Sequence, residues 1–433
     1  MINNLIFRNT LWVGLEKSLR LILGVLLSSL IARSLGPAEF GQLNFLISLL
    51  VIASVLNSLG LNRIIIREVA DHLEDIIFIK TTIITALYLR LLISLILFLF
   101  AVIFSWAIWP AHLLYSAVVF SSLFFISFDV FDFYAQGTSN FKIISICRSV
   151  AFLITSAMKL AVVFLDGGID FFVFLILFEH ALVAILFYYL FVKKNNANLS
   201  FYGVKLERGV QLLRESWPEI IAGFGAIMFM RLDMIFLQWI SGDLSVGIYS
   251  AATRITEAWY FLPAVIIATT FPKLISLRQS SYSQYLDGIR LLMSLLVTMS
   301  LVIAIIFTLT ADWIVALLYG SDYAESANVI VLHTWAGLFF CMGIASGSWL
   351  VAEKKLKLNL QRNLFGLAVS ALTNWLLIPS YGVTGSAVAT LAGMSAAFYL
   401  FDAFHPQLRP MFKLKTSALL PVYLYHFICE RRI

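Results

Sequence analysis

The chain consists of apolar blocks of about 20 residues, separated by short polar gaps. A helical block of this length crosses a hydrocarbon layer about 30 Å thick, whereas a soluble core does not need apolar residues in such long runs. Apolar residues make up 61% of the chain and charged residues only 12%, against roughly a quarter charged in ordinary soluble domains. The blocks therefore predict an all-α integral membrane protein.

We expect about twelve transmembrane helices from the length of these blocks. The first block is too long for the core of a signal peptide, so we expect it to be retained. The apolar segment 417–429 is too short to span and contains Pro421, which predicts an interfacial or packed helix. The predicted spans are 11–32, 42–66, 81–105, 113–135, 143–165, 170–192, 217–240, 248–271, 289–310, 328–351, 360–379 and 384–405.

The basic residues predict the orientation of the chain. Most of the 30 Lys and Arg lie in the N-terminus, the even-numbered gaps or the C-terminus, for example Lys193, Lys194, Lys354 and Lys355. The other gaps carry acidic residues instead, and the positive-inside rule then predicts that both termini are cytoplasmic. The net charge of +6 is explained by basic clusters facing an anionic leaflet, so we expect no nucleic-acid partner.

Two outer gaps repeat the same glycine spacing. The first reads SLGPAEFGQLN and the fourth reads ISGDLSVGIYS, so Gly36 corresponds to Gly242 and Gly41 to Gly247, with an offset of 206 residues in both cases. Six spans per half is an even number, which predicts a parallel repeat with a central cavity and a substrate path between the halves. The predicted domains are the six-helix halves 1–192 and 217–406, the cytoplasmic linker 193–216 and the cytoplasmic or interfacial tail 407–433.

Ionisable residues in or beside the predicted spans are the candidate site residues. A charge that faces lipid is expensive, so such residues normally face a cavity or a partner of opposite charge. The candidate substrate-binding cations are Arg33, Arg63, Arg90, Lys159, Arg231 and Arg254. The candidate residues for ion coupling, or counterions, are Asp129, Asp132, Asp233 and Glu257.

Some of these charges have simpler explanations. Arg63 can extend to the membrane interface, and Arg254 can form a local salt bridge with Glu257, three residues later. Arg90, Lys159 and Arg231 have no opposite charge one turn away and lie deeper in their spans, which favours a functional role.

The remaining charges predict the chemistry of the cavity. Arg231 and Asp233 are two residues apart, so they lie on different helix faces and need separate partners. Asp129 and Asp132 share a face, either as counterions of the cations or as carriers of a proton or cation. Arginine binds phosphate oxygens in a bidentate manner, which suits an anionic head group, and protonation of nearby carboxylates could switch the cavity between loaded and released forms.

Motifs for enzymatic chemistry are absent from the sequence. There is no GxxxxGK[ST] loop for ATP and no GxSxG, HExxH or paired CxxC pattern. The histidines and the three cysteines are scattered without metal-ligand spacing, so we expect neither a cofactor nor a metal. The predicted outer loops are short, which argues against a membrane-embedded polymerase, ligase or acyltransferase and favours a transporter.

Several segments together resemble the polysaccharide or O-antigen flippases, the Wzx-type branch of the multidrug/oligosaccharidyl-lipid/polysaccharide exporter superfamily. The resemblance runs from about residue 8 to about residue 406, through motifs in the expected order. Gly247, Tyr249 and Pro263 belong to the most similar segment. The segments are LIARSLGPAEFGQLNFLISLL, DFYAQGTSNFKIISICRSV, FMRLDMIFLQWISGDLSVGIYSAATRITEAWYFLPAVIIATTFPKL, LLYGSDYAESANVI and LIPSYGVTGSAVAT.

The resemblance implies an inner-membrane flippase for undecaprenyl-pyrophosphate-linked repeat units, working by alternating access and coupled to a proton or sodium gradient. It implies cavity cations at Arg33, Arg231 and Arg63; the other candidates rest on their placement alone. A polysaccharide polymerase and a chain-length regulator are possible partners. The competing interpretations are a drug or cation antiporter of the same superfamily, which would favour an acidic cavity, and a membrane-embedded polymerase or ligase.

Overall fold

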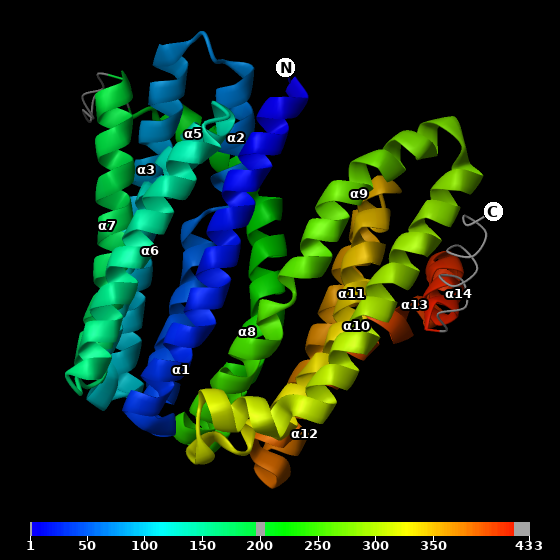
Figure 1. Ribbon diagram of the computed structural model, residues 1–433. Coiled ribbons are helices and arrows are strands. Elements are labelled where there is room, and N and C mark those ends of the chain that lie inside the picture. Colours follow the sequence, from blue (N-terminus) through cyan, green and yellow to red (C-terminus); the bar gives the residue numbers. More distant parts are fainter. Residues whose placement is uncertain (1, 196–203, 420–433) are drawn as a thin grey trace. The chain divides into compact units, whose positions relative to one another are not determined.

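The computed structural model describes residues 2–195 and 204–419, and this part of the chain is helical, with short turns between the helices (Figure 1). Helices pair every backbone group within one segment, which hydrocarbon surroundings require. The helices are α1 (Ile2–Asn57), α2 (Leu61–Asp71), α3 (Ile76–Ile108), α4 (Leu113–Ile126), α5 (Val130–Gly137), α6 (Phe141–Phe164), α7 (Ile169–Asn195), α8 (Leu206–Ala258), α9 (Phe261–Ser280), α10 (Tyr282–Leu318), α11 (Ser326–Ala352), α12 (Leu356–Ser395), α13 (Phe401–Phe404) and α14 (Arg409–Ala418).

Nine stretches of the described chain are long and apolar enough to cross a membrane. Three of them, Arg20–Asn57, Leu206–Arg278 and Leu356–Phe404, contain 38, 73 and 49 residues. The second and third each have room for two crossings of about 20 residues, and the first for two at the short end of the spanning range, about 17–19 residues. The nine stretches therefore accommodate about twelve spans. The prediction of an all-α multi-pass membrane protein is confirmed.

Some predicted spans are interrupted by turns. The predicted span 42–66 is broken because α1 ends at Asn57 and α2 begins at Leu61, and 248–271 is broken between Ala258 and Phe261. Hydropathy misses these breaks because the residues around them are as apolar as the helices. Of the predicted interfacial segment 417–429, all but the first three residues lies outside the described part of the chain.

The helices α1 and α8 are each interrupted at a glycine. Gly36 has φ 73° and ψ 171°, and Gly242 has φ 77° and ψ −174°. Positive φ is a conformation that glycine adopts without a Cβ clash. These are the glycines that the sequence repeat aligns, and they have nearly the same backbone conformation. The repeat is therefore present in the local structure of both turns.

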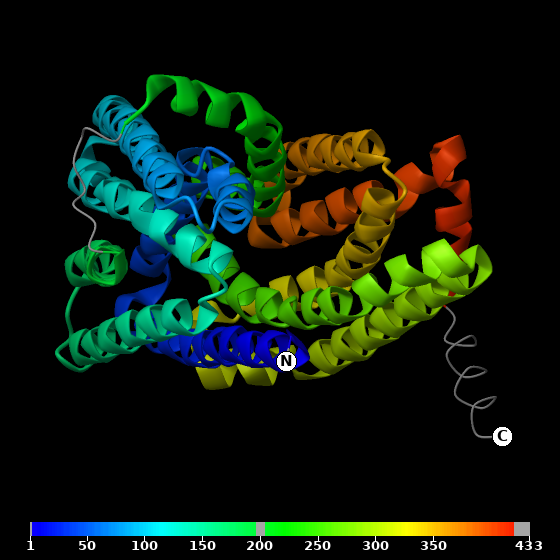
Figure 2. The same ribbon diagram turned by 90° about the horizontal axis from the view of Figure 1, so that it is seen from above.

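The described helices form two compact units. The first contains residues 1–35 and 43–227, and the second contains 36–42 and 228–433. Each unit has its own buried apolar core. In the first unit α4 packs against α3 and α7, and in the second α11 packs against α10 and α12; the close packing of α10 and α11 can be followed in Figures 1 and 2.

The start of α8 packs within the first unit. Leu212 belongs to its core, and the Arg208 guanidinium binds Glu68 of α2. Burial raises the pKa of the Glu68 carboxyl, but hydrogen bonds from Arg67 and Arg208 outweigh this effect and hold the pKa below its usual value. The described part of the predicted linker, 204–216, therefore includes ordered helix, while the domain boundaries proposed from the repeat stay a prediction.

The short segment 36–42 packs in the second unit, although the chain on both sides of it belongs to the first. A Cβ atom on Gly41 would lie 1.8 Å from the Asp243 carbonyl oxygen, and one on Gly247 would lie 1.8 Å from the Pro37 carbonyl oxygen. Pro37 and Asp243 are themselves 206 residues apart, so the contact is symmetrical. Only glycine lets two helix backbones approach this closely.

We expect Gly41→Ala to lower the stability of the folded protein by about 1–3 kcal/mol, because the added methyl group meets fixed backbone. Gly24→Ala is the control, because nothing lies within 4 Å of its Cβ position. Thermal unfolding of both variants in detergent checks this. Equal melting temperatures for the two variants would show that the Gly41 contact is not tight in solution.

Candidate functional site

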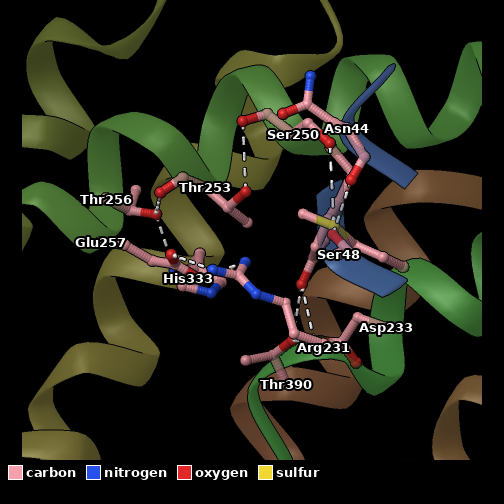
Figure 3. Close-up of polar contacts among 12 residues, drawn as sticks. Asn44, Ser48, Arg231, Asp233, Ser250, Thr253, Thr256, Glu257, His333 and Thr390 are labelled. Carbon is pink, nitrogen blue, oxygen red and sulfur yellow. Dashed lines mark hydrogen bonds and ion pairs between the residues drawn. The ribbon is translucent and has the colours of Figure 1, made fainter. Parts of the chain in front are cut away.

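Arg231 and Glu257 form an ion pair in the second unit (Figure 3). Both lie on α8, 26 residues apart, a separation of about 39 Å in a straight helix. The break at Gly242 reverses the chain, so that Nη1 lies 3.3 Å from Oε1 and Nη2 lies 3.3 Å from Oε2. The two side chains are 21% and 25% exposed, so the pair is only partly sealed from its surroundings.

Asp233 is buried beside this pair and has neutral partners. Its carboxylate accepts hydrogen bonds from the Tyr249 hydroxyl at 2.9 Å, the Thr390 hydroxyl at 2.6 Å and the Asn374 amide at 2.7 Å. No Lys or Arg of the described chain forms an ion pair with it. Arg231 and Asp233 thus have the separate partners predicted for them. A buried carboxylate without a cationic partner is suited to bind a proton or a small cation.

His333 is a member of this region that sequence reasoning missed. It is buried on α11, its Nδ1 lies 2.9 Å from the Thr256 hydroxyl, and its ring stacks on Tyr260 and meets Tyr249 edge to face. Figure 3 shows it beside Arg231 and Glu257. An isolated histidine in an apolar span gives no signal of its own, because the helix that it faces is distant in sequence.

Arg254 is exposed on the same helix, and the structure records no ion pair for it among the described residues. The predicted local salt bridge between Arg254 and Glu257 is wrong for this structure, because the chain reversal at Gly242 presents the Arg231 guanidinium to Glu257 instead.

The carboxylates Asp129 and Asp132 lie in the first unit. Asp132 is buried, pairs with Arg148 and accepts a hydrogen bond from Gln136 at 3.0 Å. Asp129 lies 3.9 Å from Arg148. Both carboxylates therefore lie near Arg148, which sequence reasoning overlooked. Its place five residues inside the span 143–165, one helix after the two aspartates, was the available signal.

Lys159 is paired with Glu179 at 2.8 Å between α6 and α7. Near this pair the first unit contains a cavity of about 150 Å³ with a polar lining. Arg20, Asp129, Arg148, Glu179 and His180 contribute its polar groups. Lys159 and the aspartates thus belong to one polar region of the first unit.

Arg90 is 1% exposed and has a structural environment. Its guanidinium donates to the carbonyl oxygens of Asn57 at 3.2 Å and Ile126 at 3.0 Å and lies over the Phe133 ring. These carbonyls end α1 and α4, where the helix dipole favours a positive charge. The expectation that Arg90 lines a cavity is corrected by this burial.

Arg33 and Arg63 are exposed. Arg63 lies 3.4 Å from Glu219, with 83% of its side chain exposed, as an arginine at a membrane interface would be. Arg33 lies on α1 before the break at Gly36.

A second repeat relates Arg148 to Arg362, 214 residues later. Arg362 is buried and donates to the Ser346 hydroxyl at 2.7 Å and the Gly343 carbonyl at 2.9 Å. With the same offset, Ser346 replaces Asp132 and Gly343 replaces Asp129. The second unit thus keeps the arginine but has neutral partners in place of the carboxylates.

The fold is similar to the folds of two solved transporter structures. The structure is similar to a lipid II flippase MurJ in an inward closed conformation, with a TM-score of 0.69 and 12% identity over 98% of this chain and 93% of that one. It is also similar to an inward-facing multidrug resistance MATE family transporter of the MOP superfamily, with a TM-score of 0.67 and 16% identity over 94% and 96% of the two chains. The predicted MATE-like fold is confirmed.

The chain belongs to the polysaccharide biosynthesis protein family, whose profile matches residues 6–276. It is 26% identical over 273 residues to the "probable flippase AglR" of Haloferax volcanii, a match that covers 60% of this chain and 54% of that protein. It is 22% identical over 180 residues to the capsular polysaccharide biosynthesis protein CapF of Staphylococcus aureus, covering 41% and 45%. The matched region thus spans about half or less of these relatives. The predicted family is confirmed.

The surroundings of the arginines predict different defects. We expect Arg90→Gln to lower the free energy of unfolding by about 2–3 kcal/mol, because hydrogen bonds from charged groups each contribute roughly 1.5–3 kcal/mol. Arg231→Gln should leave the melting temperature within a few degrees of the wild type, because its pair is partly exposed, and should instead reduce export of surface polysaccharide. Melting curves and export assays on both variants check this. A stable Arg90→Gln protein would argue against its structural role.

Proposed function

We propose that this protein is a flippase that moves an undecaprenyl-pyrophosphate-linked oligosaccharide, an O-antigen or polysaccharide repeat unit, from the cytoplasmic to the periplasmic leaflet. Membership of the polysaccharide biosynthesis family supports this proposal. So do the relatives named as flippases in Haloferax volcanii and the transporter fold. The substrate would be the lipid-linked precursor of the polymer whose synthesis the family name describes.

The observation that carries the proposal is a partly exposed arginine, Arg231, inside an apolar span. Arg231 has a guanidinium fork that suits phosphate oxygens and is held there by a carboxylate rather than buried against backbone. Arg254, Arg33, Arg63 and Lys159 remain candidates for further contacts with the anionic head group or glycan. Arg90 is left out, because it is 1% exposed and its Nε and Nη2 donate to the carbonyl oxygens of two helix ends.

The mechanism follows from the two parts of such a substrate. The pyrophosphate and glycan are polar and require a path lined by polar groups, while the polyprenyl tail stays in the lipid. A transporter with two alternating conformations exposes the polar part to one side and then to the other. Binding must be moderate, because a site that holds the pyrophosphate too tightly cannot release it.

Coupling to a proton or sodium gradient would drive this cycle in one direction. Asp233 is the best candidate, because its partners are three neutral donors, whereas Asp132 is paired with Arg148 and Glu257 with Arg231. Loading of Asp233 would remove a buried charge and so shift the balance between the two conformations.

We expect Asp233→Asn to keep the protein folded, because the amide is nearly isosteric, and to abolish the dependence of transport on the ion gradient. Uptake of a polyprenyl-pyrophosphate substrate into proteoliposomes, with and without a proton or sodium gradient, measures this. Asp287→Asn is the control, because the wild-type Asp287 carboxylate is exposed and pairs with Arg290. A variant at position 233 that still responds to both gradients would exclude Asp233 as the coupling residue.

We place the protein in the bacterial inner membrane with both termini in the cytoplasm, from the distribution of Lys and Arg. A polysaccharide polymerase and a chain-length regulator would act on its product on the periplasmic side. These partners follow from the substrate class.

Deletion of the protein should trap single lipid-linked repeat units on the cytoplasmic face. The measurement is extraction of these units from the deletion strain, after treatment of sealed spheroplasts with a membrane-impermeant glycan-modifying enzyme. Protected single units support a flippase. Accessible but unpolymerised units would indicate a polymerase or ligase, and no accumulation would favour a drug or cation antiporter.

A further inference from the structure

The contact between Arg231 and Glu257 has the geometry of an arginine with a bound anion. Both guanidinium Nη atoms face the two carboxylate oxygens, as they would face two oxygens of a phosphate. We propose that Glu257 is an internal stand-in for the substrate's pyrophosphate, which displaces it from Arg231 and transfers it to Arg254. This inference rests on the proposed function and assigns Arg231 as a binding point for the pyrophosphate.

The Arg231 pair is looser than two less exposed ion pairs of the described chain. Its two contacts are 3.3 Å long, whereas charge-assisted hydrogen bonds are usually about 2.7–2.9 Å. Lys159 and Glu179 approach to 2.8 Å, and the fully buried Lys415 and Asp402 to 2.7 Å. The long contacts indicate a carboxylate that a better ligand can replace.

The Arg231 guanidinium also has unused binding capacity. Its Nε is buried and has no hydrogen-bond partner among the described residues. A carboxylate has two oxygens and one charge, whereas a pyrophosphate has more oxygens and more negative charge. It can therefore satisfy Nε together with the Nη atoms, which Glu257 does not.

Glu257, and not Asp233, is the carboxylate that can leave. Asp233 is held by Tyr249, Thr390 and Asn374 in the interior of the unit. Glu257 is a quarter exposed and has Arg231 as its ion-pair partner in the described chain. Displacement of Glu257 breaks one loose pair, whereas movement of Asp233 would break three buried hydrogen bonds.

Arg254 lies where the displaced carboxylate needs a partner. It precedes Glu257 by three residues on α8, a spacing at which helical side chains meet, and it is exposed. Before binding, Glu257 neutralises Arg231 and leaves Arg254 open. After binding, the substrate neutralises Arg231 and Glu257 neutralises Arg254. Glu257 and both arginines then each have a partner of opposite charge within the membrane.

The stand-in has opposite effects on binding and on release. In the substrate-free state Glu257 competes with the pyrophosphate and weakens its binding. In the loaded state the same carboxylate helps to expel the substrate by reclaiming Arg231. Removal of its charge should therefore tighten binding and slow transport, whereas loss of a merely structural pair would impair both.

The test measures binding of farnesyl pyrophosphate to the purified full-length protein in nanodiscs of phosphatidylcholine. Farnesol, which lacks the pyrophosphate, is the control ligand. We expect Glu257→Gln to bind farnesyl pyrophosphate about tenfold more tightly than the wild type and to export polysaccharide more slowly. Arg231→Gln should lose the preference for farnesyl pyrophosphate over farnesol.

A matched control comes from the same unit. Arg278 and Glu353 also form a bidentate pair, with contacts of 3.0 and 3.2 Å, so Glu353→Gln removes the same charge from the same kind of contact. It should leave the affinity unchanged. Glu257→Ala is a second variant at the stand-in position and should also bind more tightly, and melting curves of every variant confirm that it is folded.

A double-variant cycle tests the part of Arg254. We expect Arg254→Gln to weaken binding about threefold in the wild-type background, since Glu257 then lacks a second partner, and to have no effect in the Glu257→Gln background. An equal loss in both backgrounds would mean that Arg254 contacts the ligand directly, which overturns the transfer.

The outcomes separate this inference from the proposed function. If the wild type binds farnesyl pyrophosphate through Arg231 but Glu257→Gln and Glu257→Ala bind no more tightly, the stand-in is overturned and the flippase proposal stands. If the wild type does not distinguish farnesyl pyrophosphate from farnesol, the pyrophosphate site itself is overturned, and with it the inference.

Discussion

Hydrocarbon solvates neither a bare peptide group nor a bare charge, and this constraint organises the whole chain. The backbone satisfies this constraint by forming helices, in which its polar groups are hydrogen-bonded. The ionisable side chains satisfy it by pairing with groups of opposite charge or with hydrogen-bond acceptors. Arg90 does so with carbonyl oxygens at the ends of two helices, and Lys159 does so with Glu179. Each deep charge is therefore informative, because its partner shows whether it is committed to the fold or available to a ligand.

The glycine breaks decide which charges can meet. Arg231 and Glu257 lie on one helical stretch, and they form a pair because Gly242 adopts a positive φ and reverses the chain. Gly36 has the same conformation in the equivalent turn. The close approach of Gly41 and Gly247 to the carbonyls of Asp243 and Pro37 then fixes these turns against each other. A local backbone property thus creates the surroundings of the candidate site.

Ion pairs in this chain differ in how firmly they are held. The buried pair of Lys415 and Asp402 is short. Burial is the main influence on Lys415 and lowers its pKa to about 8, although Asp402 opposes this. The pair of Arg231 and Glu257 is longer and partly exposed. The first arrangement holds α14 against the first turn of α13, whereas the second leaves an arginine whose partner can be exchanged. This contrast is the physical basis for treating Arg231 as part of a binding site.

The sequence by itself determined the membrane class, the approximate spans and the repeat at Gly36 and Gly242, because hydropathy and glycine spacing are local properties. It also established that Arg231 and Asp233 need different partners, because two residues of a helix separate their faces. Only the tertiary structure decided which partners these are. Asn374 and Thr390, which bind Asp233, come from α12, and Tyr249 reaches Asp233 only because α8 is broken between them. The role of Arg148 likewise depends on the packing that brings it beside Asp132. A contact between helices depends on how they pack and where the chain reverses. The hydrophobic periodicity of a single span determines neither.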